Sequence, residues 1–401
     1  MLIWGLDIMK TNDNPPQPDG SLAPHSEPGE FPLHLPPTVP YWVMRFVYRL
    51  RNFLLFLASR LMPPQLMLFE LATGGIVAQL LQQVVQLKIP DLLDQNPRTA
   101  KELAQQTGVN SEELHRMLRA CVSSGVFKLD AAGRFANNYV SHALKSGVVG
   151  SFQDTVDYFT SPEVGQVWTK LPETLRTGEG AYEQLYGCSV WDWYSKNPAA
   201  EARFARSMMS LSTLDARGIA GARPFRRLKR LGDVGGGSGL ILSEILRENR
   251  KLTGVLFDAE GVLEIAHQLL TKRGVAQRVE LQAGSFFDHV PQGCDGLLLK
   301  NILHDWDDEA ALTILGNCRS GLAVGGTLLL VEMLQETNIA SRTTSVSDVH
   351  MMMATARGKE RNQEELKALL EQSDFQLKKV HSLPGFQSLV EATAVVRAAK
   401  A

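Results

Sequence analysis

Short apolar runs alternate with longer amphipathic stretches through the C-terminal half of the chain. We predict the apolar runs to be β-strands, at Leu231–Val234, Thr253–Phe257, Val279–Ala283, Gly296–Leu303 and Gly326–Met333. The stretches between them have apolar residues at helical spacing, in Gly239–Glu248, Gly261–Arg273 and Asp308–Ser320. Strands that alternate with helices form a parallel sheet with right-handed crossovers, which predicts a doubly wound, Rossmann-like α/β domain. Two later runs, Phe375–Leu383 and Phe386–Val396, meet at Pro384-Gly385 and predict an edge hairpin.

Residues 71–145 have the pattern of a mainly helical region that ends in a hairpin. Thr99 is a candidate helix cap before one amphipathic stretch. A second stretch has its apolar residues on one face, at Leu114, Met117, Leu118, Cys121 and Val122. Two short runs around the turn Asp130–Gly133 predict a β-hairpin. Helix, turn, helix and hairpin together predict a winged helix.

The charge on this predicted winged helix favours protein contact over DNA binding. A DNA-reading helix is basic on its exposed face, whereas Glu112 and Glu113 here offset Arg116 and Arg119. The whole chain has a formal charge of −2, which gives no sign of a general affinity for nucleic acid. We therefore predict a dimerisation domain and no nucleic-acid partner.

The N-terminal region differs from the rest in composition. Residues 11–40 hold nine of the 19 prolines, and we predict a disordered tail over residues 1–40. Tyr41–Met62 combines aromatic and aliphatic residues with four arginines, which makes it a poor membrane span. Two interpretations of a basic amphipathic helix at residues 41–65 stay open: it packs on protein, or it contacts a membrane surface.

The cysteines are too far apart for a shared site. They are Cys121, Cys188, Cys294 and Cys318, and they form no CxxC pair. This spacing argues against a zinc site or a disulfide scaffold and is typical of the reducing cytoplasm. We expect a cytoplasmic protein, with membrane association through Tyr41–Met62 as the open alternative.

A glycine-rich turn follows the first predicted strand. Glycines from Gly235 to Gly239 let a ligand approach the backbone, and the next helix offers free N–H groups. The turn lacks the Lys-Ser/Thr pair of a phosphate-binding loop and the spacing of the dinucleotide motif. Asp233 before the glycines suits an ammonium group, and Asp258 at the end of the second strand suits ribose hydroxyls. Together these residues predict a site for S-adenosylmethionine.

His304 and Glu332 are the candidate chemical groups. They follow the fourth and fifth predicted strands, at the carboxyl ends where doubly wound sheets bind ligands. We therefore expect both in the same cleft as the cofactor, although they are far apart in sequence. A histidine at that place is a candidate general base.

Four stretches resemble the caffeate-type O-methyltransferases of plants and their bacterial relatives that act on polyketides and carotenoids: Asp233–Gly239, Leu299–Asp308, Asp348–Met352 and Gly358–Arg361. The resemblance runs from Leu71 to Val396. It implies S-adenosylmethionine as cofactor, a homodimer and a hydroxylated small-molecule acceptor. It also implies three units: a dimerisation domain at 66–150, a helical connector lining the substrate site at 151–225, and a methyltransferase domain at 226–401.

The resemblance also implies roles for single residues. His304 matches the catalytic base, and Glu332 and Glu360 match the acids that orient it. The cofactor-binding candidates are Asp233, Gly235, Gly237, Asp258, Ser285, Phe286, Lys300, Trp306 and Ser212, and the acceptor candidates are Asp305, Met208, Met351 and Thr355. Two residues depart from the family: Ser285 stands where Asp commonly binds the adenine, and Thr355 where plant enzymes commonly have Asn. The second departure argues against a phenylpropanoid acceptor.

These residues predict methyl transfer in which His304 removes the acceptor's hydroxyl proton. We expect no metal, because the sequence shows no carboxylate cluster with metal-ligand spacing. The methionines predict an apolar, adaptable pocket for a lipophilic acceptor such as a carotenoid or polyketide, with a soluble phenol as the competitor. Two alternative functions stay open: a relative that decarboxylates, hydroxylates or catalyses a pericyclic reaction, and a winged-helix regulator.

Overall fold

The computed structural model describes residues 34–37, 39–335, 342–355 and 357–396. Most of the predicted disordered tail, residues 1–33 and 38, lies outside the described residues. Within the described part of that tail, Leu35 is 4 % exposed and packs against the core of the α/β domain. The proline-rich composition gave no indication of this buried side chain.

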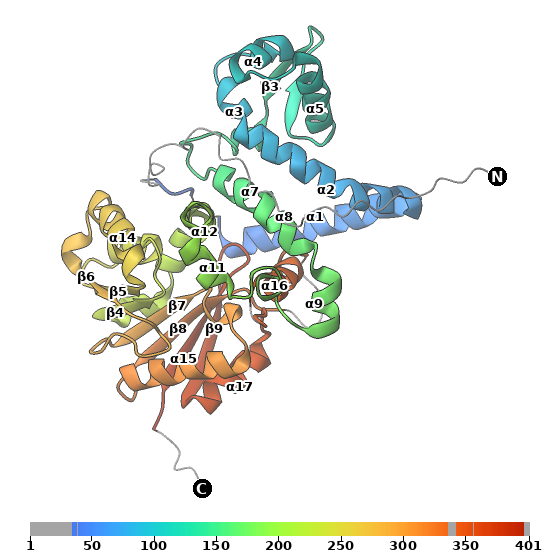
Figure 1. Ribbon diagram of the computed structural model, residues 1–401. Coiled ribbons are helices and arrows are strands. Elements are labelled where there is room, and N and C mark those ends of the chain that lie inside the picture. The colour runs from blue at the N-terminus through green and yellow to red at the C-terminus, as the bar shows by residue number, and fades with distance from the viewer. Residues whose placement is uncertain (1–33, 38, 336–341, 356, 397–401) are drawn as a thin grey trace. The chain divides into compact units, whose positions relative to one another are not determined.

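A seven-stranded mixed sheet forms the C-terminal domain (Figure 1). Its strands are β4 (Arg230–Val234), β5 (Thr253–Asp258), β6 (Val279–Ala283), β7 (Gly296–Lys300), β8 (Thr327–Glu332), β9 (Phe375–Ser382) and β10 (Ser388–Ala394). They lie in the order β6-β5-β4-β7-β8-β10-β9. Strands β4 to β8 are parallel, and β10 is antiparallel to both β8 and β9. The predicted α/β fold with its edge hairpin is confirmed.

The central strands bury both of their faces. On β5, Leu256 faces one apolar layer and Val255 the other, and on β8 Leu329 and Leu328 divide in the same way. One layer includes helices α13 (Leu240–Glu248) and α14 (Glu260–Lys272), and the other includes α15 (Asp308–Gly321) and α17 (Gln363–Gln372). Burial on both faces explains why these strands are continuous apolar runs in the sequence.

A group of helices precedes the sheet in sequence. They are α7 (Gln153–Phe159), α8 (Pro162–Trp168), α9 (Leu171–Thr177), α10 (Ala181–Tyr186), α11 (Val190–Lys196) and α12 (Pro198–Ala220). Together with α16 (Arg342–Ala354) they form an apolar cluster rich in aromatic side chains, which includes Tyr158, Tyr194 and Met353. Helix α12 also supplies Ala216 and Ile219 to the core of the sheet, so it connects this aromatic cluster to the α/β domain.

The N-terminal domain has the predicted winged-helix arrangement. Its elements are α2 (Pro64–Gln86), α3 (Ile89–Leu92), β1 (Arg98–Thr99), α4 (Ala100–Thr107), α5 (Ser111–Ser123), β2 (Phe127–Leu129), β3 (Arg134–Asn137) and α6 (Tyr139–His142). Thr99 begins α4 with a capping box, in which its hydroxyl accepts from Glu102 N and its own N–H donates to the Glu102 carboxylate. Strand β1 pairs with β3 and adds a third strand that we did not predict.

Helix α1 (Tyr41–Leu61) forms where a basic amphipathic helix was predicted, and it has no buried residue. The next helix, α2, is long and apolar enough to cross a membrane by length and composition alone. However, Gln82, Val84 and Val85 near its C-terminus are buried. The two valines belong to the core of the winged-helix domain. We therefore interpret α2 as a core helix of that domain.

The fourth predicted strand is shorter than expected. Strand β7 ends at Lys300 rather than Leu303, because Asn301 has φ +52°, a left-handed conformation that interrupts the extended backbone. The chain then turns through the 3-10 helix η3 (Leu303–Asp305). His304 therefore lies in a short turn beyond the strand.

Candidate active site

The glycine-rich turn after β4 is held to the end of β5 by a carboxylate. Asp258 Oδ2 accepts a hydrogen bond from Gly237 N at 2.8 Å, and Oδ1 accepts one from Ala259 N at 2.7 Å. Gly235 has φ +70°, and a Cβ at this position would lie 2.5 Å from Ile302 Cδ1. The backbone conformation therefore favours glycine at position 235, and a Cβ there would also displace the Ile302 side chain.

Asp233 is buried near that turn. It is 2 % exposed, and its Oδ2 has no hydrogen-bond partner among the residues that the structure describes. Burial, assisted by the negative charge of Asp258, raises the pKa of Asp233 to about 7, and Lys300 opposes this rise. A buried carboxylate oxygen without a donor is costly. It fits a ligand that brings a cationic N–H group, as the ammonium of S-adenosylmethionine does.

Lys300 extends this polar region toward helix α12. Its Nζ donates to Ser212 Oγ at 3.4 Å. Burial lowers the pKa of Lys300, and the nearby charges of Asp215, Glu332 and Asp233 oppose that lowering. The last residue of β7 and a hydroxyl of α12 therefore lie together close to Asp233.

The remaining cofactor candidates follow β6 and η3. Ser285 Oγ accepts a hydrogen bond from Phe287 N at 3.2 Å. The rings of Phe286 and Trp306 meet edge to face with their centroids 6.1 Å apart. Trp306 also stacks on Trp191 of α11, with centroids 6.3 Å apart. The candidates that follow β4, β5, β6 and β7 thus all lie along the carboxyl edge of the sheet.

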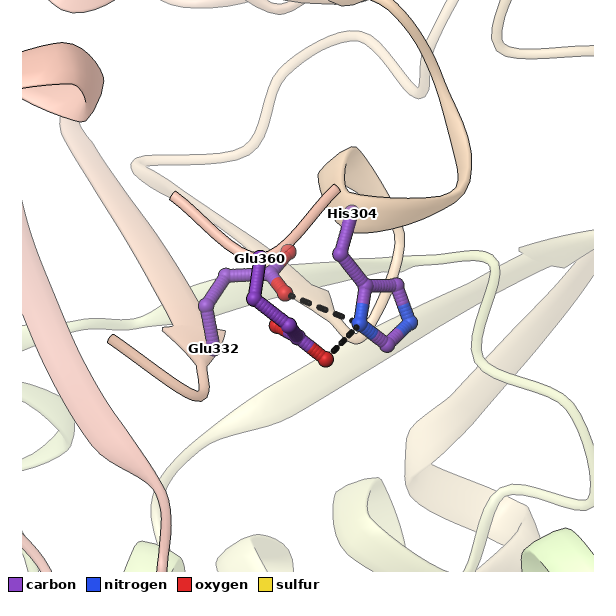
Figure 2. Close-up of side chains that lie close together, drawn as sticks. All are labelled: His304, Glu332 and Glu360. Atoms are coloured by element: carbon purple, nitrogen blue, oxygen red, sulfur yellow. Dashed lines mark hydrogen bonds and ion pairs between the residues drawn. The ribbon is translucent and has the colours of Figure 1, made fainter. Parts of the chain in front are cut away.

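His304 lies beside two glutamates that come from separate parts of the chain (Figure 2). Its Nδ1 is 3.0 Å from Glu360 Oε1 and 3.8 Å from Glu332 Oε2. Its other nitrogen, Nε2, is 3.6 Å from Asp305 Oδ1. Because an ionised carboxylate can only accept, the contact with Glu360 assigns the proton of the neutral ring to Nδ1 and leaves the lone pair on Nε2.

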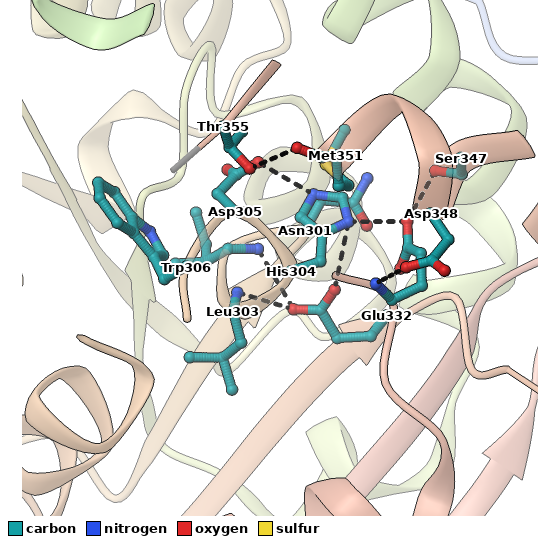
Figure 3. Close-up of polar contacts among 12 residues, drawn as sticks. Asn301, Leu303, His304, Asp305, Trp306, Glu332, Ser347, Asp348, Met351 and Thr355 are labelled. Atoms are coloured by element: carbon teal, nitrogen blue, oxygen red, sulfur yellow. Dashed lines mark hydrogen bonds and ion pairs between the residues drawn. The ribbon is translucent and has the colours of Figure 1, made fainter. Parts of the chain in front are cut away.

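Backbone and hydroxyl donors hold the two glutamates in place (Figure 3). Glu332 Oε1 accepts from Leu303 N at 3.0 Å and from Ile302 N at 3.3 Å. Glu360 Oε1 also accepts from Ser347 Oγ at 2.7 Å. These contacts connect β8 and α16 to the turn that carries His304.

Residues 358–361, which we call the clamp, hold the same turn through hydrogen bonds to its backbone carbonyls. Lys359 N donates to His304 O at 2.8 Å, and Arg361 donates to Leu303 O at 2.7 Å and to Trp306 O at 2.8 Å. A Cβ on Gly358 would lie 2.5 Å from His304 O and would collide with Thr355 Oγ1. From the sequence we assigned a role only to Glu360 in this motif. We missed Gly358 and Arg361, for which the motif itself was the available signal.

The carboxylates around His304 favour its protonated form. Burial alone disfavours a charged ring, but Asp305, Glu332 and Glu360 outweigh burial and raise the pKa of His304 to about 10. Burial also raises the pKa of Glu332 to about 7 and that of Asp305 to about 6. The site therefore stabilises an imidazolium, which makes the neutral ring a strong proton acceptor.

Three acceptor candidates lie near His304, and the fourth packs against the aromatic cluster. Asp305, Met351 and Thr355 are drawn beside His304 in Figure 3, and Met208 packs against the aromatic cluster. The Thr355 hydroxyl donates to Met351 O at 2.8 Å, so it is bonded within its own segment. His350 of α16 lies among the rings of Tyr158, Phe159 and Trp168. Burial lowers the pKa of His350 to about 4, so its ring is neutral.

The three residues that the fold brings together here have a geometry that could also hold a cation. His304, Glu332 and Glu360 each offer one ligand atom within 4.8 Å of the others. The sequence analysis expected these three residues to act together on a proton, but it did not consider them as ligands of a cation. The hydrogen bonds from Nδ1 to Glu360 and from two backbone N–H groups to Glu332 favour a proton-holding cluster over a metal site.

Comparison with known proteins identifies the class. The O-methyltransferase domain family matches residues 168–376, and the O-methyltransferase dimerisation domain family matches residues 69–146. The mitomycin biosynthesis 6-O-methyltransferase of Streptomyces lavendulae is 33 % identical over 316 residues, which are 79 % of this chain and 89 % of that protein. The phenazine-1-carboxylate N-methyltransferase of Pseudomonas aeruginosa is 32 % identical over 317 residues, which are 79 % of this chain and 93 % of that protein.

Solved structures support the same class of enzyme. An O-methyltransferase from neocarzinostatin biosynthesis, solved with S-adenosylmethionine and 2-hydroxy-5-methyl naphthoic acid, has a TM-score of 0.69 and 30 % identity. The similarity covers 80 % of this chain and 96 % of that one. The protein is an S-adenosylmethionine-dependent O-methyltransferase. It belongs to the family that joins an O-methyltransferase domain to a dimerisation domain, as the bacterial enzymes of secondary metabolism do.

The clamp yields a first prediction, on Gly358→Ala. The new Cβ would push the turn that carries His304, so we expect a loss of about 1–3 kcal/mol of stability, the usual cost of overpacking, together with reduced methyl transfer. Gly316→Ala is the matched control, because nothing lies within 4 Å of a Cβ at that position on α15. Thermal unfolding of both variants measures the difference, and equal melting temperatures would show that the clamp tolerates a side chain.

The cluster of His304 with Glu332 and Glu360 yields a second prediction. We expect methyl transfer to be unchanged after exhaustive dialysis against EDTA, because His304 Nδ1 is hydrogen-bonded to Glu360 and Glu332 Oε1 accepts from two backbone N–H groups. Initial rates before and after dialysis, with the metal content determined by mass spectrometry, measure this. Activity that disappears on dialysis and returns with one divalent cation would establish a metal site at this cluster.

Proposed function

We propose that the enzyme methylates a hydroxyl group on a lipophilic or aromatic small molecule, with His304 as the general base. The observation that carries this proposal is the 3.0 Å contact between His304 Nδ1 and Glu360 Oε1. It fixes the tautomer whose lone pair is on Nε2, the nitrogen that is not bonded to either glutamate. An imidazole oriented in this way can take a proton from an acceptor hydroxyl.

The carboxyl edge of strands β4 to β7 would hold the cofactor. Asp233 would bind the ammonium group, and Asp258 the ribose hydroxyls through the second lone pairs of its oxygens. Gly235 and Gly237 would allow close approach to the backbone. The further contacts would come from Ser212, Ser285, Phe286, Lys300 and Trp306. When bound, S-adenosylmethionine supplies an electrophilic methyl group on a sulfonium.

The protein's own contribution to the reaction is proton removal and alignment. His304 would take the acceptor's hydroxyl proton at Nε2 while the acceptor oxygen takes up the methyl group that the cofactor would supply. Glu360 then stabilises the imidazolium at Nδ1, and Glu332 and Asp305 add negative charge around the ring. Glu332 and Glu360 are positioning residues, because they act through His304 and do not contact the reacting atoms.

The surroundings of the base support an aromatic acceptor. Tyr158, Phe159 and Trp168 group around the neutral ring of His350, and Met208 adds an adaptable apolar surface. The names of the relatives point the same way, since they refer to a mitomycin, a phenazine and a naphthoic acid. Asp305, Met351 and Thr355 would complete the acceptor's surroundings, because they lie beside His304.

We also propose a homodimer formed through the N-terminal domain, at residues 66–150. The match to the dimerisation family over residues 69–146 supports it. So do Leu66, Phe69 and Ile76 of α2, which are large apolar side chains left exposed in the single chain. The units at 151–225 and 226–401 would then line the acceptor site and bind the cofactor within each subunit.

The third prediction tests the base. His304→Gln keeps a hydrogen-bonding side chain of similar size but cannot accept the proton, so turnover should fall by about 10²–10⁴ while cofactor affinity is kept. His381→Gln is the matched control, because His381 also bonds a glutamate, Glu391, at 2.8 Å but lies outside the cluster. Rates of transfer from labelled S-adenosylmethionine to hydroxynaphthoates and hydroxyphenazines provide the readout. Wild-type turnover in His304→Gln at neutral pH would refute the assignment.

The fourth prediction concerns pH. The neutral ring is the active base, so kcat/KM should increase with pH until His304 is deprotonated. Asp305→Asn removes one of the charges that raise the pKa of His304, so the rising limb should move to lower pH, by about one unit or more. Glu309→Gln removes an exposed charge from the first turn of α15 and should leave the profile in place. An unshifted profile in Asp305→Asn would show that Asp305 does not set the proton affinity of the base.

A further inference from the structure

In the single chain, helix α1 leaves an apolar stripe uncovered along its length. Trp42, Phe46, Leu50, Phe53 and Leu57 recur every three or four residues and so lie on one face of the helix. In the single chain Trp42 is 73 % exposed, Phe46 63 % and Phe53 56 %. The helix touches the rest of the protein through Tyr48, whose ring meets that of Phe386 with centroids 5.3 Å apart.

All charged side chains of α1 are positive. Arg45, Arg49, Arg51 and Arg60 lie in the helix, and it contains no aspartate or glutamate. In the part of the chain that the structure describes, no acidic side chain pairs with any of these four arginines. By helical spacing, Arg49 and Arg60 fall beside the apolar stripe, where long side chains can extend toward phosphate groups while their stems stay in an apolar layer.

A second copy of the chain is a poor complement to this surface. Pairing two α1 helices would bring the arginines of both together, and the adjoining helix α2 offers only Glu70 as an acidic residue. The match to the dimerisation family begins at residue 69, after α1 has ended. A membrane crossing is also excluded, because four arginines within the helix would each cost a few kcal/mol at the centre of a bilayer.

We propose that α1 is an interfacial helix that docks the enzyme on lipid bilayers with acidic headgroups. The apolar stripe would enter the boundary between headgroups and acyl chains, and the arginines would bind lipid phosphates and other anionic headgroup oxygens. Trp42 and Tyr41 at the start of the helix are residue types that favour this boundary. The proposal goes beyond the methyltransferase reaction and does not depend on the identity of the acceptor.

The fifth prediction tests this surface with the full-length enzyme and two kinds of vesicle. The enzyme should sediment with vesicles that contain phosphatidylglycerol and stay in solution with vesicles of phosphatidylcholine alone, and high salt should release it. The Arg45→Gln/Arg49→Gln variant should bind the acidic vesicles roughly 30-fold more weakly. The matched control is Arg116→Gln/Arg176→Gln, which removes two arginines whose side chains are each 72 % exposed on other helices. The control should bind as the wild type does.

A second variant distinguishes membrane binding by α1 from contact of α1 with a partner subunit. Phe46→Ser/Phe53→Ser should lose vesicle binding while its mass by light scattering, its cofactor affinity and its methyl transfer in solution stay those of the wild type. Failure of the wild-type enzyme to bind acidic vesicles at low salt would overturn the proposal. So would equal binding by the two double-arginine variants. If Phe46→Ser/Phe53→Ser instead halves the mass of an enzyme that ignores vesicles, a second copy covers α1.

Discussion

The burial of His304 among three carboxylates is the constraint on which the surrounding architecture depends. Buried charges cost several kcal/mol each unless they are paired and hydrogen-bonded. The fold meets this demand locally at one oxygen of each glutamate. Glu332 Oε1 accepts hydrogen bonds from two backbone N–H groups, and Glu360 Oε1 accepts hydrogen bonds from Ser347 Oγ and from the imidazole. The second oxygen of each glutamate has no hydrogen-bond partner among the described residues. The turn η3 exists in its observed form because its backbone contributes donors to Glu332.

The same demand explains the segment after α16. Arg361 is buried and binds the carbonyls of Leu303 and Trp306 on either side of His304, and it also pairs with Asp308 at the start of α15. Gly358 permits this approach, since any side chain would collide with the His304 carbonyl. Contacts from β8, α16 and residues 358–361 thus immobilise one imidazole, which is the preorganisation that a general base needs.

The sequence predicted those elements that depend on interactions between residues near one another in the chain. Strands β4, β5 and β8 are largely buried, and the apolar runs that this burial produces allowed their prediction almost to the residue. The partly exposed strand β6 was predicted with the same accuracy. The end of β7 was missed because a left-handed Asn301 has no distinct pattern in the sequence. Ser347 could not be assigned a role, because its function consists of a tertiary hydrogen bond to Glu360, a group that local patterns do not bring near. The buried Leu35 was missed for the same reason.

The buried carboxylates at the carboxyl edge of the sheet are of two kinds: those that accept hydrogen bonds from the protein and one that does not. Glu332 and Glu360 each have an oxygen that accepts from protein donors, as residues that orient another side chain should. In the described part of the chain, the Asp233 side chain accepts no such bond, although it is as buried as they are. Burial favours the protonated acid at Asp233, so an ammonium group that restores its charge gains both a salt bridge and a hydrogen bond. The carboxyl edge of the sheet therefore contains two glutamates that are hydrogen-bonded around the base His304. It also contains Asp233, whose carboxylate can bind a cationic ligand.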